Sequence, residues 1–164
     1  NAIVHKNDNP LELGKIFDTI SVCLSKGLGC PIGSVLIGNS KIMSNALRIR
    51  KILGGGMRQA GYLASAGIYA LENNLSRLFE DHQRAREIGE VLAKSTYVKS
   101  VEKIETNIVI FELNKEINDS LFIDKLKRLN IKLISMGSNK LRLVTHLNYT
   151  NIHHDYFLSS IKSL

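Results

Sequence analysis

Several residue types and segments that mark particular protein classes are scarce or absent in this chain of 164 residues. The two cysteines, Cys23 and Cys30, are too few for a zinc site or a disulfide framework, so we expect reduced thiols in a cytoplasmic protein. No apolar run approaches the roughly 20 residues that span a bilayer, which predicts no membrane segment. Residues 1–10 contain neither an initiator Met nor the apolar core of a secretory signal. We therefore expect the chain to start after processing or inside a longer protein.

Aromatic residues are also scarce, at 6%, and tryptophan is absent, although the formal net charge is +7. A basic protein that binds nucleic acid usually shows clustered cations or a known motif. Here the cations are spread from Lys6 to Lys162, and no RNA- or DNA-binding motif is present. We therefore expect no nucleic-acid partner. A hydrophobic content of 44% and a charged content of 23% are typical of a soluble globular protein with a real core.

The hydrophobic pattern predicts both helices and strands. In the first part we expect a helix or loop at 2–17, strands at 19–24 and 34–38, and a basic helix or turn at 44–53; the strand at 34–38 should be buried. A long helix should follow from Met57 to Lys94, with a bend near 73–79 and a face of small residues over 60–71. In the second part we expect strands at 98–104 and 107–113, a helix at 120–129 capped by Asp119, a hairpin at 132–145 and a helix from Thr150. This order predicts an α+β module of about 85 residues that follows a different first part.

A lysine follows the first predicted strand, on a turn rich in glycine. Lys26 comes after the strand-forming run 19–24, and Gly27, Gly29 and Gly33 interrupt regular structure beyond it. Desolvation at such a place would lower the pKa of the lysine and leave a neutral, nucleophilic amine. The alternative is an ordinary surface lysine in a glycine-rich loop, and this stretch alone does not decide between the two.

A triple glycine, Gly54–Gly56, lies between Lys51 and Arg58 and precedes the long predicted helix. Free N–H groups at a helix N-terminus attract anions, and glycine lets the backbone approach the anion closely. The pattern thus predicts an anion site flanked by cations, with a flexible basic loop as the alternative. The spacing matches neither a Walker A nor a Rossmann motif.

An arginine alternates with apolar residues in a predicted strand near the C-terminus. Arg142 is either an edge-strand cation that faces water or a buried fork for a carboxylate. His146 follows the strand and could act as a base, although a histidine there is more often structural. His153 and His154 are adjacent in a helix and point in different directions, so we expect no metal site.

A reactive lysine, an anion site and a carboxylate-binding arginine are together what a pyridoxal phosphate enzyme acting on amino acids requires. The lysine holds the aldehyde of the cofactor, the anion site holds its phosphate, and the arginine holds the carboxylate of the substrate. Their joint occurrence is more informative than any one of them.

Three long segments, in this order, extend this pattern: SVCLSKGLGCPIGSVLIG, RKILGGGMRQAGYLASAGIYAL and RLVTHLN. Together they resemble the low-specificity L-threonine aldolases, which are fold type I pyridoxal phosphate enzymes of the beta-eliminating lyase group. The likeness extends over essentially the whole chain. It implies an α/β fold in which residues 1–76 form the C-terminal part of the cofactor-binding large domain and residues 77–164 form a small α+β domain.

The resemblance also implies roles for individual residues. Lys26 matches the Schiff-base lysine, Arg142 matches the arginine that binds the substrate carboxylate, and Arg58, with Lys51 close by, matches the basic group that reaches a cofactor phosphate across a subunit interface. The implied reaction is retro-aldol cleavage of L-threonine or L-allo-threonine to glycine and acetaldehyde through an external aldimine. A homo-oligomer, a dimer or tetramer with active sites at subunit interfaces, is implied as well.

The chain also departs from the family pattern. Family members extend further at the N-terminus, where an aspartate pairs with the pyridine nitrogen and a histidine stacks on the ring, so we expect the C-terminal half of an aldolase, with the general base in the other half. Asn148 stands where aspartate is common. The alternatives are another fold type I enzyme, such as a racemase or transaminase, or a non-catalytic interaction domain.

Overall fold

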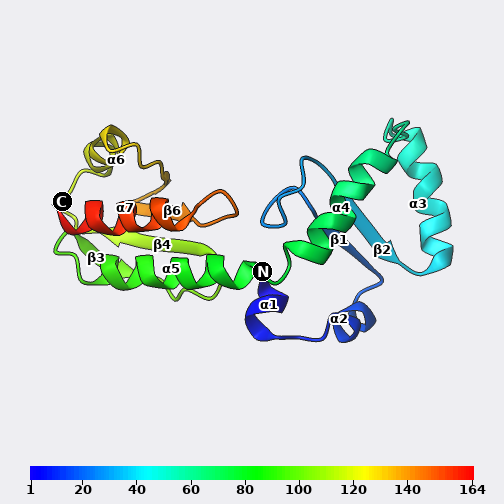
Figure 1. Ribbon diagram of the computed structural model, residues 1–164, viewed down its shortest axis with the longest axis horizontal. Coiled ribbons are helices and arrows are strands. Elements are labelled where there is room, and N and C mark those ends of the chain that lie inside the picture. Colours follow the sequence, from blue (N-terminus) through cyan, green and yellow to red (C-terminus); the bar gives the residue numbers. More distant parts are fainter. The chain divides into compact units, whose positions relative to one another are not determined.

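The computed structural model describes all residues, 1–164, and these form two compact units (Figure 1). The N-terminal unit comprises Lys6–Leu78. The C-terminal unit comprises Phe79–Leu164 together with the first residues of the chain, Asn1–His5. The chain therefore passes between the two units twice.

The N-terminal unit is built on a two-stranded antiparallel sheet, with Thr19 opposite Gly38 and Cys23 opposite Ser34. Its elements are α2 (Pro10–Ile16), β1 (Thr19–Cys23), β2 (Ser34–Gly38), α3 (Ser40–Ile52) and α4 (Gly61–Asn73). The short helix α1 (Ala2–Lys6) precedes them. Loop 24–33 joins the two strands and carries the predicted reactive lysine.

Strand β2 has the predicted bounds but not the predicted burial, because all five of its residues are exposed. Its apolar sequence, SVLIG, is typical of a strand covered on both faces. Within this chain β2 pairs only with β1, so its apolar side chains remain open to solvent. The small-residue face predicted around Gly67 is buried in part: Gly67 and Ala70 of α4 are buried, and a Cβ on Gly67 would lie 3.1 Å from the side chain of Leu24.

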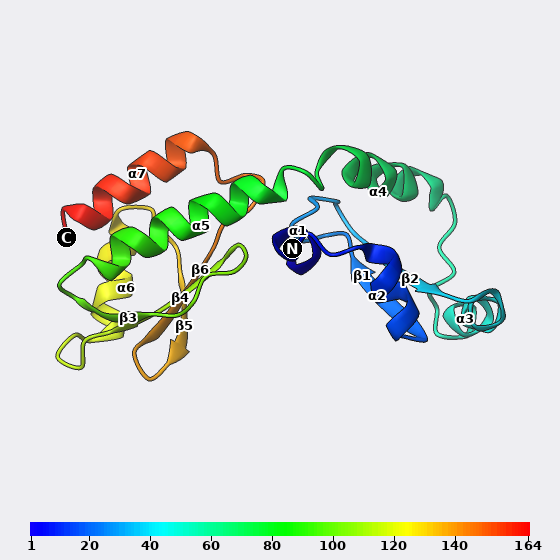
Figure 2. The same cartoon turned by 90° about the horizontal axis from the view of Figure 1, so that it is seen from below.

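The C-terminal unit packs helices against a four-stranded antiparallel sheet of order β3-β4-β6-β5. Figure 2 shows α5 and α7 side by side on one face of this sheet. The elements are α5 (Leu78–Ala93), β3 (Val98–Val101), β4 (Ile108–Leu113), α6 (Asp119–Arg128), β5 (Ile134–Gly137), β6 (Lys140–Val144) and α7 (Asn151–Lys162). The α+β module expected from the sequence is thus present.

The core of this unit lies between the sheet and its three helices. Phe111 and Leu113 of β4 and Leu141 of β6 are at most 1% exposed. They join one apolar cluster with Leu92 of α5 and Ile161 of α7. Truncating a large side chain in such a core typically costs about 3–5 kcal/mol, so this cluster fixes the strands firmly.

Element boundaries show where the sequence pattern was imprecise. The helix expected from Met57 begins at Gly61, and the bend expected near 73–79 is a break between α4 and α5. The side chain of Asn118, not Asp119, caps α6, by accepting a hydrogen bond of 3.1 Å from Leu121 N. None of the helices is both long and apolar enough to cross a membrane.

Candidate active site

Lys26 lies on a turn within the loop 24–33. Leu24 N donates a hydrogen bond to Gly33 O (2.9 Å), which closes the loop at its base. Gly29 N donates to Lys26 O (2.9 Å), and Gly29 has φ +76°, a left-handed conformation that glycine adopts without strain. Lys26 is therefore presented on a defined turn.

Helix α4 holds this turn from outside the loop. The side-chain amide of Asn74, at the end of α4, donates to Leu28 O (2.8 Å). The thiol of Cys30 donates to Ala66 O (3.5 Å), and Cys30 itself is buried. Two hydrogen bonds, at Leu28 and Cys30, thus fix the part of the loop that follows Lys26 to helix α4.

The lysine itself is exposed, and its ammonium group has no hydrogen-bond or ion-pair partner within the chain. Of the two alternatives left open by the sequence, a desolvated lysine and a surface lysine, the structure of this chain shows the exposed one. The strand before Lys26 contains apolar residues, but β1 is only partly buried.

The triple glycine does not form the predicted backbone cradle for an anion. The N–H groups of Gly54, Gly55 and Met57 all donate to carbonyl groups of residues 50–55. Helix α4 begins only at Gly61, so its N-terminus is separated from the glycines. The segment closes on itself in a turn, for which Gly54 adopts φ +83°.

A lysine side chain takes the place of that cradle. A Cβ built on Gly56 would lie 2.7 Å from Cδ and 3.2 Å from Nζ of Lys51, so a larger residue here would make this side chain move from its place over the turn. Residues 19–71 contain no aspartate or glutamate, and Arg58 is exposed beyond the turn. The positive charge of this stretch comes from Lys26, Lys41, Arg48, Arg50, Lys51 and Arg58. This charge favours an anionic ligand.

Arg142 lies on β6, which is a central strand and not an edge strand. It pairs with Ile110 of β4 on one side and with Ile134 of β5 on the other. Because side chains alternate along a strand, Arg142 points to the face opposite buried Leu141, away from the helices. The alternative of an edge-strand cation is thereby excluded.

The Nε atom of Arg142 is buried and has no hydrogen-bond partner. Leaving such a donor desolvated and unpaired costs roughly 1–3 kcal/mol or more for a charged group. A ligand carboxylate would satisfy this guanidinium, which is what the carboxylate-binding interpretation requires.

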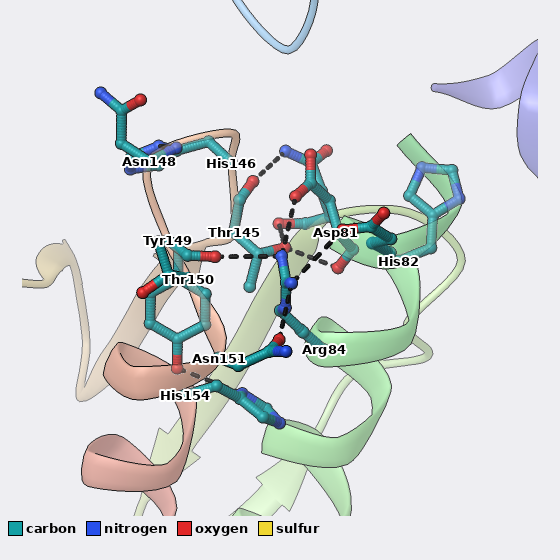
Figure 3. Close-up of polar contacts among 12 residues, drawn as sticks. Asp81, His82, Arg84, Thr145, His146, Asn148, Tyr149, Thr150, Asn151 and His154 are labelled. Carbon is teal, nitrogen blue, oxygen red and sulfur yellow. Dashed lines mark hydrogen bonds and ion pairs between the residues drawn. The ribbon is translucent and has the colours of Figure 1, made fainter. Parts of the chain in front are cut away.

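Polar residues at the start of α5 meet the connection between β6 and α7, which comprises residues 145–150 (Figure 3). Arg84 donates to Tyr149 O (3.0 Å) and to Asn151 Oδ1 (2.8 Å), and its side chain is only 14% exposed. Asp81, one turn earlier, is 0% exposed. The sequence does not single out these two residues, because an i, i+3 pair of opposite charges is typical of a solvated helix face. No local signal reveals that a loop from far along the chain covers them.

The histidines near the C-terminus have separate structural partners. His146 is exposed, and its Nδ1 accepts a hydrogen bond from Asn148 N (3.2 Å). His153 takes part in the cap of α7, whereas His154 Nε2 lies 2.6 Å from Glu87 Oε2. The expectation that His153 and His154 point in different directions is confirmed. Hydrogen bonds from Gln83 and His154 hold the pKa of the Glu87 carboxyl below its usual value.

The predicted site residues thus divide between the two units. Lys26, Lys51 and Arg58 belong to the N-terminal unit, and Arg142 belongs to the C-terminal unit. Three of the four have an arrangement compatible with the predicted role: Lys26 has no partner and lies on a fixed turn, Lys51 folds over glycine, and Arg142 has a buried donor that lacks an acceptor.

Comparison with known proteins gives a consistent set of relatives. Residues 1–116 match the model of the beta-eliminating lyase family. The chain is 43% identical over 148 residues to the low specificity L-threonine aldolase of Escherichia coli K12, covering 90% of this chain and 43% of that protein. It is 38% identical over 153 residues to low-specificity L-threonine aldolase 1 of Arabidopsis thaliana, covering 90% of this chain and 42% of that one. The chain therefore spans less than half the length of these curated relatives.

Solved structures show the same fold at low identity. A putative aromatic amino acid beta-eliminating lyase/threonine aldolase from Exiguobacterium has a TM-score of 0.77 at 16% identity, covering 99% of this chain and 49% of that one. A putative L-allo-threonine aldolase from Listeria monocytogenes has a TM-score of 0.76 at 16% identity, covering 99% and 48%. The histidinol-phosphate aminotransferase of Clostridium acetobutylicum has a TM-score of 0.66 at 17% identity, covering 98% of this chain and 51% of that one. The predicted fold class, α/β of the pyridoxal phosphate fold type I, is confirmed.

Proposed function

Because the chain belongs to the beta-eliminating lyase family, we propose that the complete protein that carries it is a pyridoxal phosphate-dependent aldolase. Its proposed reaction is the cleavage of L-threonine or L-allo-threonine to glycine and acetaldehyde. The relatives named as threonine aldolases support this choice within the family. The structural observation that carries it is the buried, unpaired Nε of Arg142, because an enzyme for free amino acids needs a fixed cation for the carboxylate.

The residues of the chain fit the cofactor. Lys26 would hold its aldehyde through Nζ, since that amine has no competing partner. Lys51 and Arg58 would hold its phosphate, because they lie in a stretch without acidic residues. When bound, pyridoxal phosphate accepts the electron pair that is released as the bond between Cα and Cβ breaks.

Arg142 would orient the substrate in this reaction. A guanidinium binds a carboxylate in a bidentate manner and so fixes its plane as well as its position. Fixing the carboxylate also fixes the direction of the bond between Cα and Cβ, and orientation of the breaking bond is a major source of rate enhancement. The leaving hydroxyl proton passes to a base, and Cα receives a proton to give glycine.

Release of acetaldehyde is the direct test of the proposed reaction. We expect the purified complete protein to release acetaldehyde from L-threonine in equal amount to glycine, with acetaldehyde followed by a coupled alcohol dehydrogenase and glycine by chromatography. Formation of D-threonine or of an oxo acid without acetaldehyde would instead identify a racemase or a transaminase. A protein that binds no pyridoxal phosphate would be the non-catalytic interaction domain.

The phosphate role of Lys51 gives a second expected result. Lys51→Gln removes one charged hydrogen bond, worth about 1.5–3 kcal/mol, so the dissociation constant for pyridoxal phosphate should rise by roughly 10- to 150-fold. Gly56→Ala should act in the same direction, because a Cβ there collides with the Lys51 side chain. The measurement is a fluorescence titration of the apoprotein with the cofactor.

Lys41→Gln is the matched control for this titration. Lys41 is an exposed lysine of the same helix, α3, and its replacement makes the same change in net charge. If Lys41→Gln and Lys51→Gln weaken cofactor binding equally, the effect is one of overall charge and Lys51 is not a phosphate ligand.

A further inference from the structure

The connection between β6 and α7, residues 145–150, is held at both of its ends by the first turns of α5. It begins one residue after β6, the strand that carries Arg142. In Figure 3 its residues Thr145 and Tyr149 face Asp81 and Arg84 of α5. A helix far away in the sequence thus controls the position of this connection.

The first point of attachment is Thr145, which is 1% exposed. Its hydroxyl donates to the backbone carbonyl of Asp81 (2.7 Å). Its own carbonyl accepts from the side-chain amide of Asn107 (2.8 Å), and its N–H donates to Asn107 O (3.0 Å). Every polar group of Thr145 is therefore paired, which fixes the C-terminal end of β6.

The second point of attachment is Arg84. Its Nη1 donates to Tyr149 O and its Nη2 to Asn151 Oδ1, at 3.0 and 2.8 Å. Asp81 Oδ1 and Glu80 Oε2 lie 3.9 and 3.3 Å from the same guanidinium and balance its charge. The guanidinium presents several donors in one fixed plane, which suits a backbone carbonyl and a side-chain amide oxygen at once, whereas the ammonium of lysine is a single point of charge.

Arg142 needs such support because its Nε is desolvated and unpaired. A donor in that state gains free energy by moving toward water, unless the structure around it resists the movement. Strand β6 has only five residues, and Thr145 follows directly after its last residue, Val144. Loosening the connection would therefore let the end of β6, and Arg142 with it, shift.

We propose that Arg84 is a positioning residue, which holds the connection 145–150 against α5 and thereby keeps the guanidinium of Arg142 in place for a carboxylate. The inference rests on the proposed function in assigning a carboxylate to Arg142. Arg84 does not touch the substrate, and its effect reaches the site through Tyr149, Thr145 and β6.

The test compares two amines that differ in the carboxylate. Glycine and methylamine both react with protein-bound pyridoxal phosphate, but only glycine can bind to Arg142. In Arg84→Gln we expect the dissociation constant of glycine, measured by spectral titration of the complete protein, to rise by about 2- to 30-fold, the range found for coupling through packed residues. The constant for methylamine should change by less than about twofold, because its binding does not use Arg142. Equal weakening of both amines would overturn the proposal, since a merely destabilised protein loses both.

Two further variants guard the interpretation. Arg86→Gln is the matched control, because Arg86 lies on the same helix, its guanidinium lies 5.7 Å from the ring centroid of Phe79, and its replacement removes the same charge. Asn151→Ala removes one acceptor of Arg84 at the surface and should raise the dissociation constant of glycine by a smaller factor. It replaces Arg84→Gln in the test if that variant does not fold. If Arg84→Gln cannot be made and Asn151→Ala shows no selective loss of glycine binding, the proposal is also overturned.

Hydrogen exchange separates this inference from the proposed function. In Arg84→Gln the amides of residues 140–150 should exchange faster than in the wild type, as followed by mass spectrometry, whereas those of β4 (108–113) should not change. This readout needs neither cofactor nor activity. If the protein proves not to cleave threonine, faster exchange still supports the role of Arg84, and unchanged exchange refutes it.

Discussion

Replacing Lys26 by alanine is expected to abolish the yellow absorbance of covalently held pyridoxal phosphate and to lower kcat by on the order of 10²–10⁴-fold, the size of effect typical of one catalytic side chain. Alanine leaves no amine to hold the aldehyde. Lys26→Arg should behave in the same way, because a guanidinium keeps the charge but stays protonated and is not a nucleophile. The measurements are the visible spectrum and the rate of acetaldehyde release.

The position of Lys26 makes this result easy to interpret. Its side chain is exposed and has no partner within the chain, so its loss should change the free energy of unfolding by no more than about 0.5 kcal/mol. Lys41→Ala, at another exposed lysine of the N-terminal unit, should leave spectrum and rate unchanged. An unchanged spectrum in Lys26→Ala would contradict the assignment of the covalent anchor.

The fold followed from the sequence where the signal was local. The bounds of β2 were predicted to the residue, because SVLIG is flanked by Gly33 and by the turn at Asn39. The chain reverses direction at Gly137–Asn139, inside the predicted hairpin, where three successive residues have positive φ. Apolar periodicity and turn residues act over a few positions, so the sequence alone is sufficient for them.

Burial did not follow from the sequence in the same way. Strand β2 was expected to be covered, because an apolar strand usually lies inside a complete layer. Coverage depends on what packs above a strand, and within this chain β2 has only β1 beside it. The roles of Asp81 and Arg84 were missed for the opposite reason: a charged helix face looks solvated until a distant segment, here residues 145–150, is placed over it.

The sequence predicted which types of residue form the candidate site, but it did not predict how their groups are arranged in space. The sequence identified Lys51 and the triple glycine as an anion site, but it assigned the binding to backbone N–H groups. In the structure those groups of Gly54 and Gly55 are already used, and the lysine lies over Gly56. Hydrogen bonds inside a turn depend on φ and ψ at each residue, and the glycines that permit one turn permit several.

Replacing Arg142 is expected to separate activity from stability. Arg142→Ala removes two charged hydrogen bonds to the carboxylate of the substrate, at about 1.5–3 kcal/mol each, so kcat/KM for L-threonine should fall by on the order of 10²–10⁴-fold. The same change removes a buried donor without a partner, so the free energy of unfolding should stay equal or rise. Arg142→Lys should recover only part of the activity, because an ammonium cannot bind the carboxylate in a bidentate manner.

The control for Arg142 lies on the same face of the same strand. Lys140 is two residues away on β6 and forms an exposed ion pair with Glu102 at 2.8 Å, which is worth little in solution. Lys140→Ala should therefore leave kcat/KM within about twofold of the wild type. If instead Arg142→Ala lowers the melting temperature markedly as well as the activity, the arginine is a structural residue of the sheet, and the unpaired Nε does not mark a carboxylate site. Loss of activity with stability retained is the result expected when a cation held in place for a ligand is removed, because the desolvation of that cation costs free energy until the ligand binds.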